Sequence, residues 1–303
     1  MNADNVLVSV ICDVYNHEPY LRDCLEGFIN QKTNFTYEIL IHDDASTDNS
    51  VNIIKEYVNK YPHLFKPIFQ TENQYSKGMS IWYDIQIPRA KGKYIAICEG
   101  DDYWIDPYKL QKQVDFMEAN PDYSVTFHRY RIYDEDNHSW RDDRCSIYLN
   151  NEQEFVRISV EEFLNNWVTQ PVTMVFRNNL NLGNHIPYRL RRDQHLIYHL
   201  LKEGNGYILN FEAAVYREHK GGIHSKTSLV NQCKVAVLIA SEFYKYNGTD
   251  ILKENYIKNL DWAIETFIQN KENKLLCIKF IIKRFVLSFS LKRFIKQFVK
   301  LVK

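Results

Sequence analysis

Apolar residues are distributed along the chain in two patterns, uninterrupted runs and helical spacing. Uninterrupted apolar runs of about four to eight residues are typical of buried strands, and apolar positions about every three or four residues indicate helices. Short apolar runs occur, in chain order, at residues 6–12, 37–42, 67–70, 94–98 and 124–128. Helix-spaced apolar residues follow three of them, after Pro19, Ser46 and Asp106. Strand and helix therefore alternate, which predicts a mostly parallel sheet with helices on both faces.

The second half of the chain has weaker strand signals and longer helix signals. Residues 129–184 are irregular, and strand-like pieces remain at 171–176 and 207–209. Long helices are predicted over 231–246 and 256–268. We therefore expect an α/β domain over residues 1–230, with halves 1–128 and 129–230, followed by a C-terminal helical extension over residues 231–303.

The last segment carries two apolar stripes that point in different directions. One stripe consists of Ile278, Ile281, Ile282, Phe285 and Phe289. The other, rotated by about half a turn, consists of Leu291, Phe294, Ile295, Phe298 and Val302. One straight helix cannot bury both stripes against one surface. We therefore expect two amphipathic helices with a break near residues 288–290.

The charge distribution singles out the same segment. The 303 residues contain 38 basic and 38 acidic residues, but residues 271–303 contain ten Lys or Arg and one acid. Subtraction leaves 28 basic and 37 acidic residues before residue 271, so a body near −9 precedes a tail near +9. Such asymmetry indicates contact with an anionic surface.

The final predicted helix has the pattern of a helix that lies on a membrane surface. Its cations Lys292, Arg293, Lys296 and Lys300 lie opposite its apolar stripe. We therefore expect residues 291–303 to contact an anionic membrane surface. Packing on the protein itself or in a homodimer is the alternative, and nucleic acid is not an expected partner.

The cysteine spacing and the lengths of the apolar segments argue against several classes of protein. The six cysteines form no Cys-x-x-Cys pair, which argues against zinc and dithiol redox chemistry. Those in apolar runs are expected to be reduced core residues, as in a cytosolic chain. No signal peptide is evident, and no apolar segment reaches the roughly 18–20 residues that span a bilayer.

The most informative stretch is residues 94–104, where an apolar run ends in three carboxylates within four residues. These are Glu99, Asp101 and Asp102. In open α/β sheets, ligands bind beyond the carboxyl ends of the strands. Clustered carboxylates repel one another unless a cation lies between them, and hard divalent cations often bring substrate phosphates with them. The stretch predicts a metal-bridged phosphate site, whereas the simpler interpretation is a solvated acidic turn that caps the next helix.

Three segments together resemble the family-2 nucleotide-sugar glycosyltransferases of bacterial cell-surface polysaccharide synthesis. They are Val-Ser-Val-Ile-Cys-Asp-Val-Tyr-Asn at 8–16, Ile-His-Asp-Asp-Ala-Ser-Thr-Asp-Asn-Ser at 41–50, and Glu-Gly-Asp-Asp at 99–102. The resemblance covers roughly residues 5–225 and implies the Rossmann-like GT-A fold, with residues 1–128 as the nucleotide-sugar half and 129–230 as the acceptor half. Two departures stand out. Glu99 replaces the usual first Asp of the metal motif, and a common Asn-x-Gly-x-x-x-Ala-Arg-Asn stretch is absent at residues 73–90.

The resemblance implies roles on the donor side. Asp44 accepts a hydrogen bond from the base, and Asp13, Tyr15 and Asn16 form the nucleotide-contacting loop. A carboxylate that accepts a ring N–H suits uracil, so a UDP-sugar is the expected donor. The remaining implied contacts to metal, sugar-nucleotide or diphosphate are Asp102, Asp101, His219 and Arg217, with Glu99, Asp43, Lys77, Arg89 and His224 as weaker candidates. Capping of the backbone is an equal alternative for Asp43.

Fewer sequence motifs indicate which residues contact the acceptor. Asp193, in Arg-Arg-Asp-Gln-His-Leu-Ile, resembles the family's general base, an acid at a helix start that deprotonates the acceptor hydroxyl. Without the family it is an acid stabilised at a helix N-terminus. Trp167, Gln170 and Arg177 are candidate acceptor contacts, with core packing as the alternative for Trp167.

These residues predict an inverting glycosyltransferase that depends on Mn²⁺ or Mg²⁺. It would move a hexosyl or N-acetylhexosaminyl group from a nucleotide diphosphate, expected to be UDP, to a glycan or lipid-linked acceptor. The expected location is cytoplasmic, peripheral at the inner face of the cell membrane. A nucleotidyltransferase and a catalytically inactive binding scaffold are the alternatives, but residues 13–20 do not form the Gly-rich phosphate loop expected of the former.

Overall fold

The computed structural model describes residues 6–150, 152–179, 188–189, 191–222, 227–271 and 273–302. It divides into two compact units, Met1–His219 and Lys220–Lys303. The division lies shortly before the expected position at residue 230, because the chain leaves the sheet at the end of its last strand, β10 (Asn205–Glu218).

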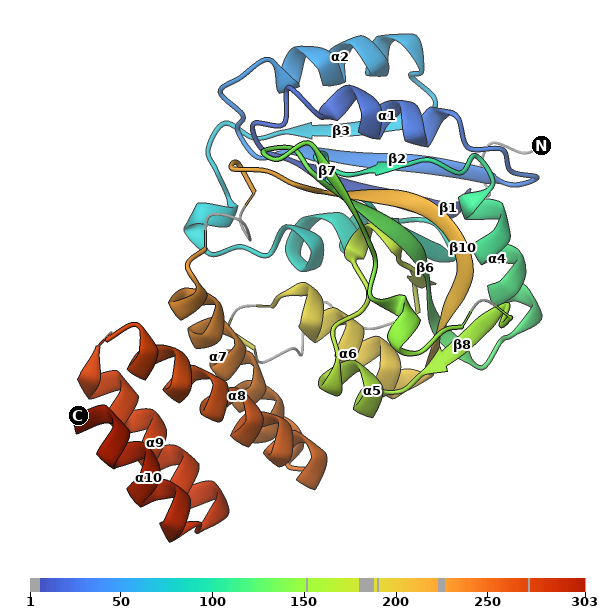
Figure 1. Cartoon of the computed structure of the whole chain (residues 1–303). Helices are drawn as coiled ribbons and strands as arrows, with labels where there is room; N and C mark the ends of the chain where they lie inside the picture. The colour runs from blue at the N-terminus through green and yellow to red at the C-terminus, as the bar shows by residue number, and fades with distance from the viewer. Residues whose placement is uncertain are drawn as a thin grey trace. The chain divides into compact units, whose positions relative to one another are not determined.

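The first half of the sheet is parallel, as the alternation of strand and helix predicts. Its strands follow the order β3-β2-β1-β4. They are β1 (Val6–Val14), β2 (Thr36–Asp43), β3 (Phe65–Phe69) and β4 (Tyr94–Ile97). In Figure 1, α1 (Leu21–Ile29) and α2 (Ser50–Lys60) lie on one side of these strands, and the short helical segments of residues 81–89 lie on the other. The carboxyl ends of the parallel strands therefore share one edge of the sheet.

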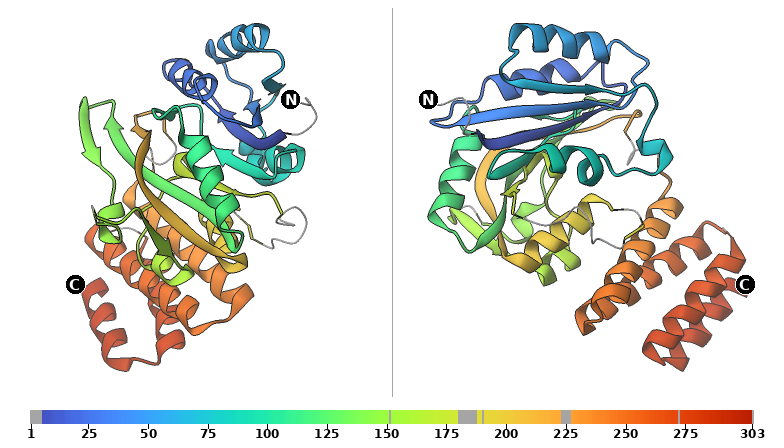
Figure 2. Two further views of the ribbon diagram at one scale, coloured as in Figure 1. Left: turned by 90° about the vertical axis from the view of Figure 1, so that its right-hand side faces the viewer. Right: turned by 180° about the vertical axis from the view of Figure 1, so that it is seen from behind.

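The second half of the sheet is mixed. Within the described residues, ten strands form one sheet, and the order continues β9-β6-β10-β5. β9 (Val175–Arg177) is antiparallel to both β4 and β6 (Tyr123–Asp134). β6 and β10 run side by side and parallel over most of their length (Figures 1 and 2). The remaining strands, all antiparallel to their partners, are β5 (Tyr103–Trp104), β7 (Ser139–Asp142) and β8 (Phe155–Ile158).

Three local predictions need correction. Residues 171–173, expected to begin a strand, form a 3₁₀ turn, and only Val175–Arg177 pairs with the sheet. Pro171 has no N–H to donate to a strand ladder, which favours the turn. The helix expected from Asp106 is α4 (Lys109–Ala119) and begins later, although the Asp106 side chain accepts the N–H of Tyr108. Pro19, expected in a first helical turn, precedes α1, which begins at Leu21.

The remaining helices of the first unit are short, apart from the one that carries Asp193. They are η1 (Tyr75–Lys77), the π-helix η2 (Ile81–Gln86), α3 (Ile87–Arg89), η3 (Cys145–Ile147), α5 (Val160–Asn165), η4 (Pro171–Thr173) and α6 (Asp193–Glu203). Asp193 is the first residue of α6, so the predicted helix start at this acid is confirmed.

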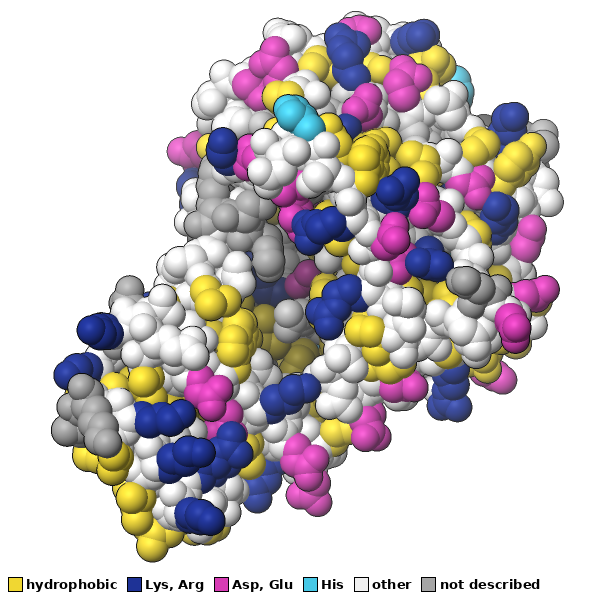
Figure 3. Space-filling view, viewed as in Figure 1, with side chains coloured by type: hydrophobic (Ala, Val, Ile, Leu, Met, Phe, Trp, Pro, Cys, Tyr) yellow, Lys and Arg dark blue, Asp and Glu magenta, His cyan; other side chains and the backbone are white. Residues whose placement is uncertain are grey.

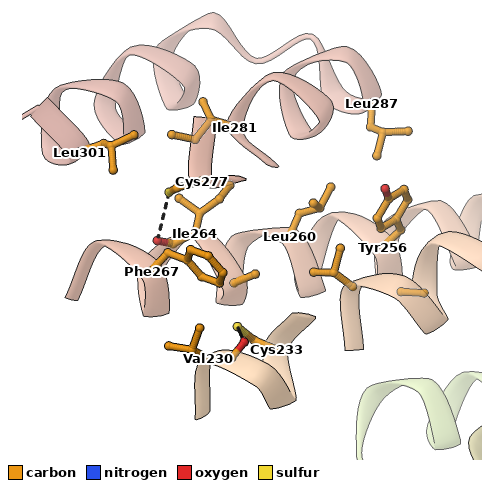
Figure 4. Close-up of a cluster of buried hydrophobic side chains, with 13 residues drawn as sticks. Val230, Cys233, Tyr256, Leu260, Ile264, Phe267, Cys277, Ile281, Leu287 and Leu301 are labelled. Carbon is orange, nitrogen blue, oxygen red and sulfur yellow. Dashed lines mark hydrogen bonds between the residues drawn. The ribbon is translucent and has the colours of Figure 1, made fainter. Parts of the chain in front are cut away.

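The second unit consists of helices. They are α7 (Leu229–Asn247), α8 (Asp250–Gln269), α9 (Lys274–Ser288) and α10 (Leu291–Val302). The predicted break near residues 288–290 is confirmed, and Phe289 ends α9 in the left-handed conformation. A buried apolar cluster, which includes Cys233, Leu260, Phe267 and Ile281, joins these helices (Figure 4). In the described part of the chain, no helix is long and apolar enough to cross a bilayer.

All six cysteines lie among the described residues, and each is buried and free. Cys24 of α1 lies with its sulfur 3.9 Å from the sulfurs of Cys12 and Cys98. Burial raises the pKa of the Cys98 thiol to about 11, because the charged thiolate loses its hydration. The prediction that Cys12 and Cys98 are core residues is therefore confirmed.

Candidate active site

Acidic side chains gather where the parallel strands end. Asp13 lies near the end of β1, Asp43 ends β2 and Asp44 follows it. The acidic turn of residues 99–102 follows β4, which pairs directly with β1. The strands are held in register by their ladder hydrogen bonds, so carboxylates that are far apart in sequence are brought to one edge of the sheet.

Of the carboxylates in the acidic turn, that of Asp102 is buried and those of Glu99 and Asp101 are half-buried. A backbone hydrogen bond of 3.1 Å from the N–H of Asp102 to the carbonyl of Glu99 closes the turn. Burial raises the pKa of Asp102 well above its ordinary value, and the neighbouring Asp101 adds to the shift. Burial and Asp101 also raise the pKa of Glu99. The turn is therefore a place where positive charge is favoured.

Two histidines contact the carboxylate of Asp101. Its Oδ2 lies 3.1 Å from Nε2 of His219 and 3.6 Å from Nε2 of His17. Burial works against ionisation, but His17 and His219 outweigh it, and the pKa of Asp101 lies below its ordinary value. The sequence analysis did not predict a role for His17. Its position directly after the predicted nucleotide-contacting loop could have indicated that it lies in the site.

The residues predicted to hold a metal are brought together in part. Asp101 and His219 are in contact, and Asp102 lies in the same turn with Oδ1 accepting the N–H of Arg217 at 2.8 Å. Within the described residues, no group of three or more His, Cys, Asp or Glu has the geometry of a metal site. The donor set nevertheless suits Mn²⁺ or Mg²⁺, because both ions prefer oxygen ligands and the raised pKa values of Asp102 and Glu99 indicate that a cation between these carboxylates is favoured.

Arg217 is a buried residue that contacts several elements of the site. Its side chain is 6% exposed, and its guanidinium contacts Asp23, Glu135 and the carbonyl of Asp101. The rings of Tyr20 and Tyr103 flank it, with centroids 5.2 and 4.5 Å from its central carbon. The guanidinium is thus engaged by α1, the end of β6 and the acidic turn. This geometry favours a positioning role over the predicted contact with diphosphate.

The predicted nucleotide side is built around Asp44. Its two carboxylate oxygens accept the N–H groups of Gln74 and Tyr75 at 2.7 and 3.0 Å. Asp44 therefore fixes the start of η1. Each carboxylate oxygen of Asp44 has a second lone pair, which could accept a hydrogen bond from a nucleotide base. The Asp43 carboxylate accepts the N–H of Ser46 at 3.0 Å, which is the capping interaction weighed from the sequence.

The predicted nucleotide loop has a distinctive backbone. Asn16 has a positive φ of 56°, and its side-chain oxygen accepts the N–H of Thr47 at 2.7 Å. This bond ties the loop after β1 to the loop after β2. Tyr15 beside it is 46% exposed, so its ring is available to a ligand.

The π-helix η2 supplies contacts that the sequence reasoning missed. Gln86 donates from Nε2 to the Asp13 carboxylate at 2.9 Å and to the carbonyl oxygens of Cys12 and Leu40. Burial raises the pKa of Asp13 to about 7, with Asp44 adding to the shift and the bond from Gln86 opposing it. π-Helical turns occur frequently at functional sites, but nothing in the sequence of this segment indicated one.

The candidate base lies near the acidic turn. Asp193 begins α6, and its negative charge contributes to the raised pKa values of Glu99 and of the buried Tyr83 hydroxyl. The preceding segment is held by a two-pronged ion pair of Arg191 with Asp84 of η2, at 2.5 and 2.6 Å. Arg191 has a φ of 40°, a left-handed conformation that costs energy for a non-glycine residue.

Several predicted residues lie apart from this cluster. Lys77 pairs with Glu72 at the surface. Arg89 donates to the carbonyl of Lys66, but it is near enough to the cluster for its charge to lower the pKa of Asp13. Arg177 pairs with Tyr94 at the start of β4, the end opposite the acidic turn. Its guanidinium binds the Tyr94 hydroxyl and three backbone carbonyls, which is a structural role.

The other acceptor candidates pack locally, and one candidate is not described. Trp167 packs near Phe163, with ring centroids 5.5 Å apart. Gln170 accepts the Thr173 hydroxyl through its backbone carbonyl at 2.7 Å. His224 lies outside the described residues.

Comparison with known proteins identifies the family. The model of glycosyl transferase family 2 matches residues 9–182, which is more than half of the chain. The chain belongs to glycosyl transferase family 2. An uncharacterized protein of Mycobacterium tuberculosis, Rv1520, is 35% identical over 224 residues, or 71% of this chain and 60% of its own length. The family-2 chain thus spans about three fifths of the length of the first curated relatives it matches.

Solved structures support the fold. The first 349 residues of Staphylococcus aureus TarS, solved in complex with UDP-GlcNAc, superpose with a TM-score of 0.67 at 17% identity. The match covers 93% of this chain and 81% of that one. The mannosyltransferase PcManGT of Pyrobaculum calidifontis, solved with GDP-Man and Mn²⁺, gives a TM-score of 0.53 at 14% identity over 98% of this chain and 85% of its own. The predicted GT-A fold with a C-terminal helical extension is therefore confirmed.

Loss of the Asp84–Arg191 ion pair is expected to slow this family-2 protein without weakening nucleotide binding. In Asp84→Asn, we expect kcat to fall about tenfold, since the strained Arg191 would no longer hold the start of α6 in place. Glu118→Gln, which breaks the exposed ion pair with Lys93, is the control. Equal loss of nucleotide affinity and kcat in Asp84→Asn would contradict a positioning role.

The raised pKa of Asp13 predicts a specific pH dependence of stability. A carboxyl with a raised folded-state pKa contributes stability that is full below its ordinary value near 4 and lost as pH rises through about 7. We expect Asp13→Asn, measured in EDTA, to remove part of the fall in unfolding free energy between pH 4 and pH 8, on the order of 1–2 kcal/mol. Parallel pH profiles for both proteins in denaturant titrations would contradict this.

Proposed function

We propose that the protein is an inverting, metal-dependent glycosyltransferase that uses a nucleotide diphosphate sugar, expected to be a UDP-sugar. The observation that carries the proposal is the gathering of Asp13, Asp44 and the acidic turn at one sheet edge, with Asp193 at the start of α6 close enough to raise the pKa of Glu99. Family membership gives this constellation its chemical class. TarS, bound to UDP-GlcNAc in its structure, supports the choice of UDP.

The reaction divides between the two sides of the site. Asp193 takes the proton of the acceptor hydroxyl, whose oxygen forms a bond to the anomeric carbon as the bond from that carbon to the diphosphate breaks. A single displacement inverts the anomeric configuration. Asp101, Asp102 and His219 would hold a divalent cation, which when bound offsets the negative charge that develops on the departing diphosphate.

The remaining residues orient the donor and the acidic turn. Tyr15 offers an exposed ring to the nucleotide, and Asp13 and Asp44 offer acceptor oxygens to its polar N–H and O–H groups. Arg217 and His17 hold Asp101 and Asp102 in place. Because these contacts are made within the protein, they restrict how the side chains of the acidic turn can move.

The acceptor is proposed to be a glycan or a lipid-linked glycan of bacterial cell-surface polysaccharide assembly, used at the inner face of the cell membrane. Incubation of the full chain with a panel of UDP- and GDP-sugars and Mn²⁺, with detection of the released nucleotide diphosphate, tests the donor class. Turnover with one UDP-sugar that stops in EDTA supports the proposal. Tight nucleotide binding without release from any sugar, even with glycan acceptors present, would favour a binding scaffold instead.

A further inference from the structure

The second unit leaves an apolar surface across two neighbouring helices. On α9, exposed apolar residues recur at helical spacing, namely Leu275, Ile282, Val286 and Phe289. On α10 the exposed apolar residues are Leu291, Ile295, Phe298 and Val299. Together these eight residues are called the α9–α10 face. Isolated exposed apolar residues are ordinary, but a contiguous set marks an interaction surface.

Aromatic contacts link the C-terminal end of α9 to α10 across the junction of the two helices. The ring of Phe285 lies 6.3 Å from that of Phe289 and 5.0 Å from that of Phe294, and Phe294 lies 6.0 Å from Phe298. Phe289 at the corner between the helices is 78% exposed, and Phe298 is 40% exposed. The row of rings therefore runs from the C-terminal end of α9 onto α10.

The structure corrects the composition of the predicted stripes. Phe294, expected to face a membrane, packs against the buried cluster of the second unit, and Leu301 is buried in it. Ile281 of the first stripe is likewise buried, whereas Ile282 of the same stripe is exposed. Each helix thus uses one side for the core of its own unit and presents another side to solvent. Removal of all of α10 would expose that core, so point substitutions test the surface more cleanly.

The charged residues of α9 and α10 themselves are all basic. Residues 274–302 contain eight Lys or Arg and no Asp or Glu. Figure 3 shows dark blue side chains gathered on the C-terminal helices beside yellow apolar ones. Asp261 of α8 is paired with Arg284 and Arg293. In the part of the chain that the structure describes, Lys292, Lys296 and Lys300 have no carboxylate within ion-pair distance.

These lysines also line a depression between α8 and α10, on the side of α10 away from its exposed apolar residues. It has a volume of about 390 Å³ and is lined by Glu265, Ile268, Ser290, Lys292, Arg293, Lys296, Gln297 and Lys300. Arg293 is paired with Asp261, so the remaining charged residues of the lining are three lysines and Glu265. The net charge of the depression is therefore positive. A hollow of this size and sign suits an anionic group such as the phosphate of a headgroup.

We propose that the α9–α10 face binds an anionic phospholipid surface. Helix α10 has exposed apolar residues on one side and, on the opposite side, lysines with no carboxylate at ion-pair distance among the described residues. This is the pattern of a helix in a membrane interface, where the apolar side meets acyl chains and the cations meet acidic headgroups. A second copy of this chain would bring like charges together around the same face, which is unfavourable. The inference does not depend on the proposed catalysis, because lipid binding is measured without donor or acceptor.

Flotation of the full chain with vesicles tests the proposal. We expect binding to vesicles of 30% phosphatidylglycerol in phosphatidylcholine, no binding to phosphatidylcholine alone, and weaker binding as salt rises. Lys292→Gln/Lys296→Gln/Lys300→Gln and Phe289→Ser/Phe298→Ser are each expected to weaken binding at least tenfold. Lys245→Gln/Lys253→Gln/Lys258→Gln, which removes the same charge from α7 and α8, should bind as the unaltered protein does.

Other outcomes would overturn the assignment. Failure of the unaltered chain to float with phosphatidylglycerol vesicles, or unchanged binding by both face variants, would exclude this surface. A dimer in light scattering that Phe289→Ser/Phe298→Ser converts to monomer, without vesicle binding by the unaltered chain, would assign the face to self-association. Displacement from the vesicles by millimolar inorganic phosphate at constant ionic strength would show an isolated phosphate site. Thermal unfolding of each variant, expected to match the unaltered chain because the substituted side chains are exposed, verifies the fold.

Discussion

Replacement of Asp193 with asparagine is expected to reduce sugar transfer by at least about a thousandfold while UDP affinity changes less than about threefold. Asparagine cannot accept the acceptor proton, and general base catalysis of this kind contributes about 10²–10⁴-fold. The helix start is preserved, because an Asn amide oxygen can still accept the Gln194 N–H that Asp193 Oδ1 accepts at 2.8 Å. Calorimetry with UDP and product formation from the donor that the panel identifies measure the two quantities.

The matched control is Glu203→Gln, which removes a carboxylate from the other end of the same helix. It should retain nearly full activity. Loss of UDP binding together with activity in Asp193→Asn would instead make Asp193 a donor or structural residue. Full transfer activity in Asp193→Asn would remove it from the mechanism altogether.

The second large effect is expected at the acidic turn. Asp102→Asn should lower turnover by at least about a hundredfold, since loss of one principal electrostatic contributor has effects of about 10²–10³. The asparagine oxygen can still accept the Arg217 N–H that Asp102 accepts at 2.8 Å, so the turn should keep its conformation. Thermal unfolding with and without Mn²⁺ gives a second measurement, in which stabilisation by the ion should be lost in the variant.

Asp115→Asn, on the exposed side of α4, is the control for charge alone. It should respond to Mn²⁺ as the unaltered protein does. Unchanged turnover of the unaltered protein in EDTA, or of Asp102→Asn in Mn²⁺, would rule out a metal held by this turn.

Much of the first unit was predictable because its signals are local. The apolar runs around residues 6–12 and 94–98 became β1 and β4, since an uninterrupted apolar run is stable only when both faces of the strand are covered. The acidic residues that follow them could be assigned to one edge for the same reason. Parallel strands place their carboxyl ends together whatever the intervening sequence.

The arrangement inside the site depended on residues that carry no such pattern. His17 reaches Asp101 only because the loop after β1 folds over the turn after β4. Gln86 reaches Asp13 from a π-helix, which has no periodicity signal of its own in the sequence. Arg217 lies in a motif that suggested a ligand contact, yet its guanidinium is engaged by Asp23 and Glu135 from two other elements.

The C-terminal helices show most clearly which properties the sequence determines and which depend on tertiary packing. Amphipathic spacing and the excess of cations are properties of the sequence, and they determined that residues 274–302 form two helices with a basic surface. Which apolar residues are buried was decided by packing. Phe294 and Leu301 fill the core of the unit, while Phe289 and Phe298 are left exposed. A helical wheel gives directions around one axis, but burial depends on where the neighbouring helices lie, and only the tertiary structure contains that.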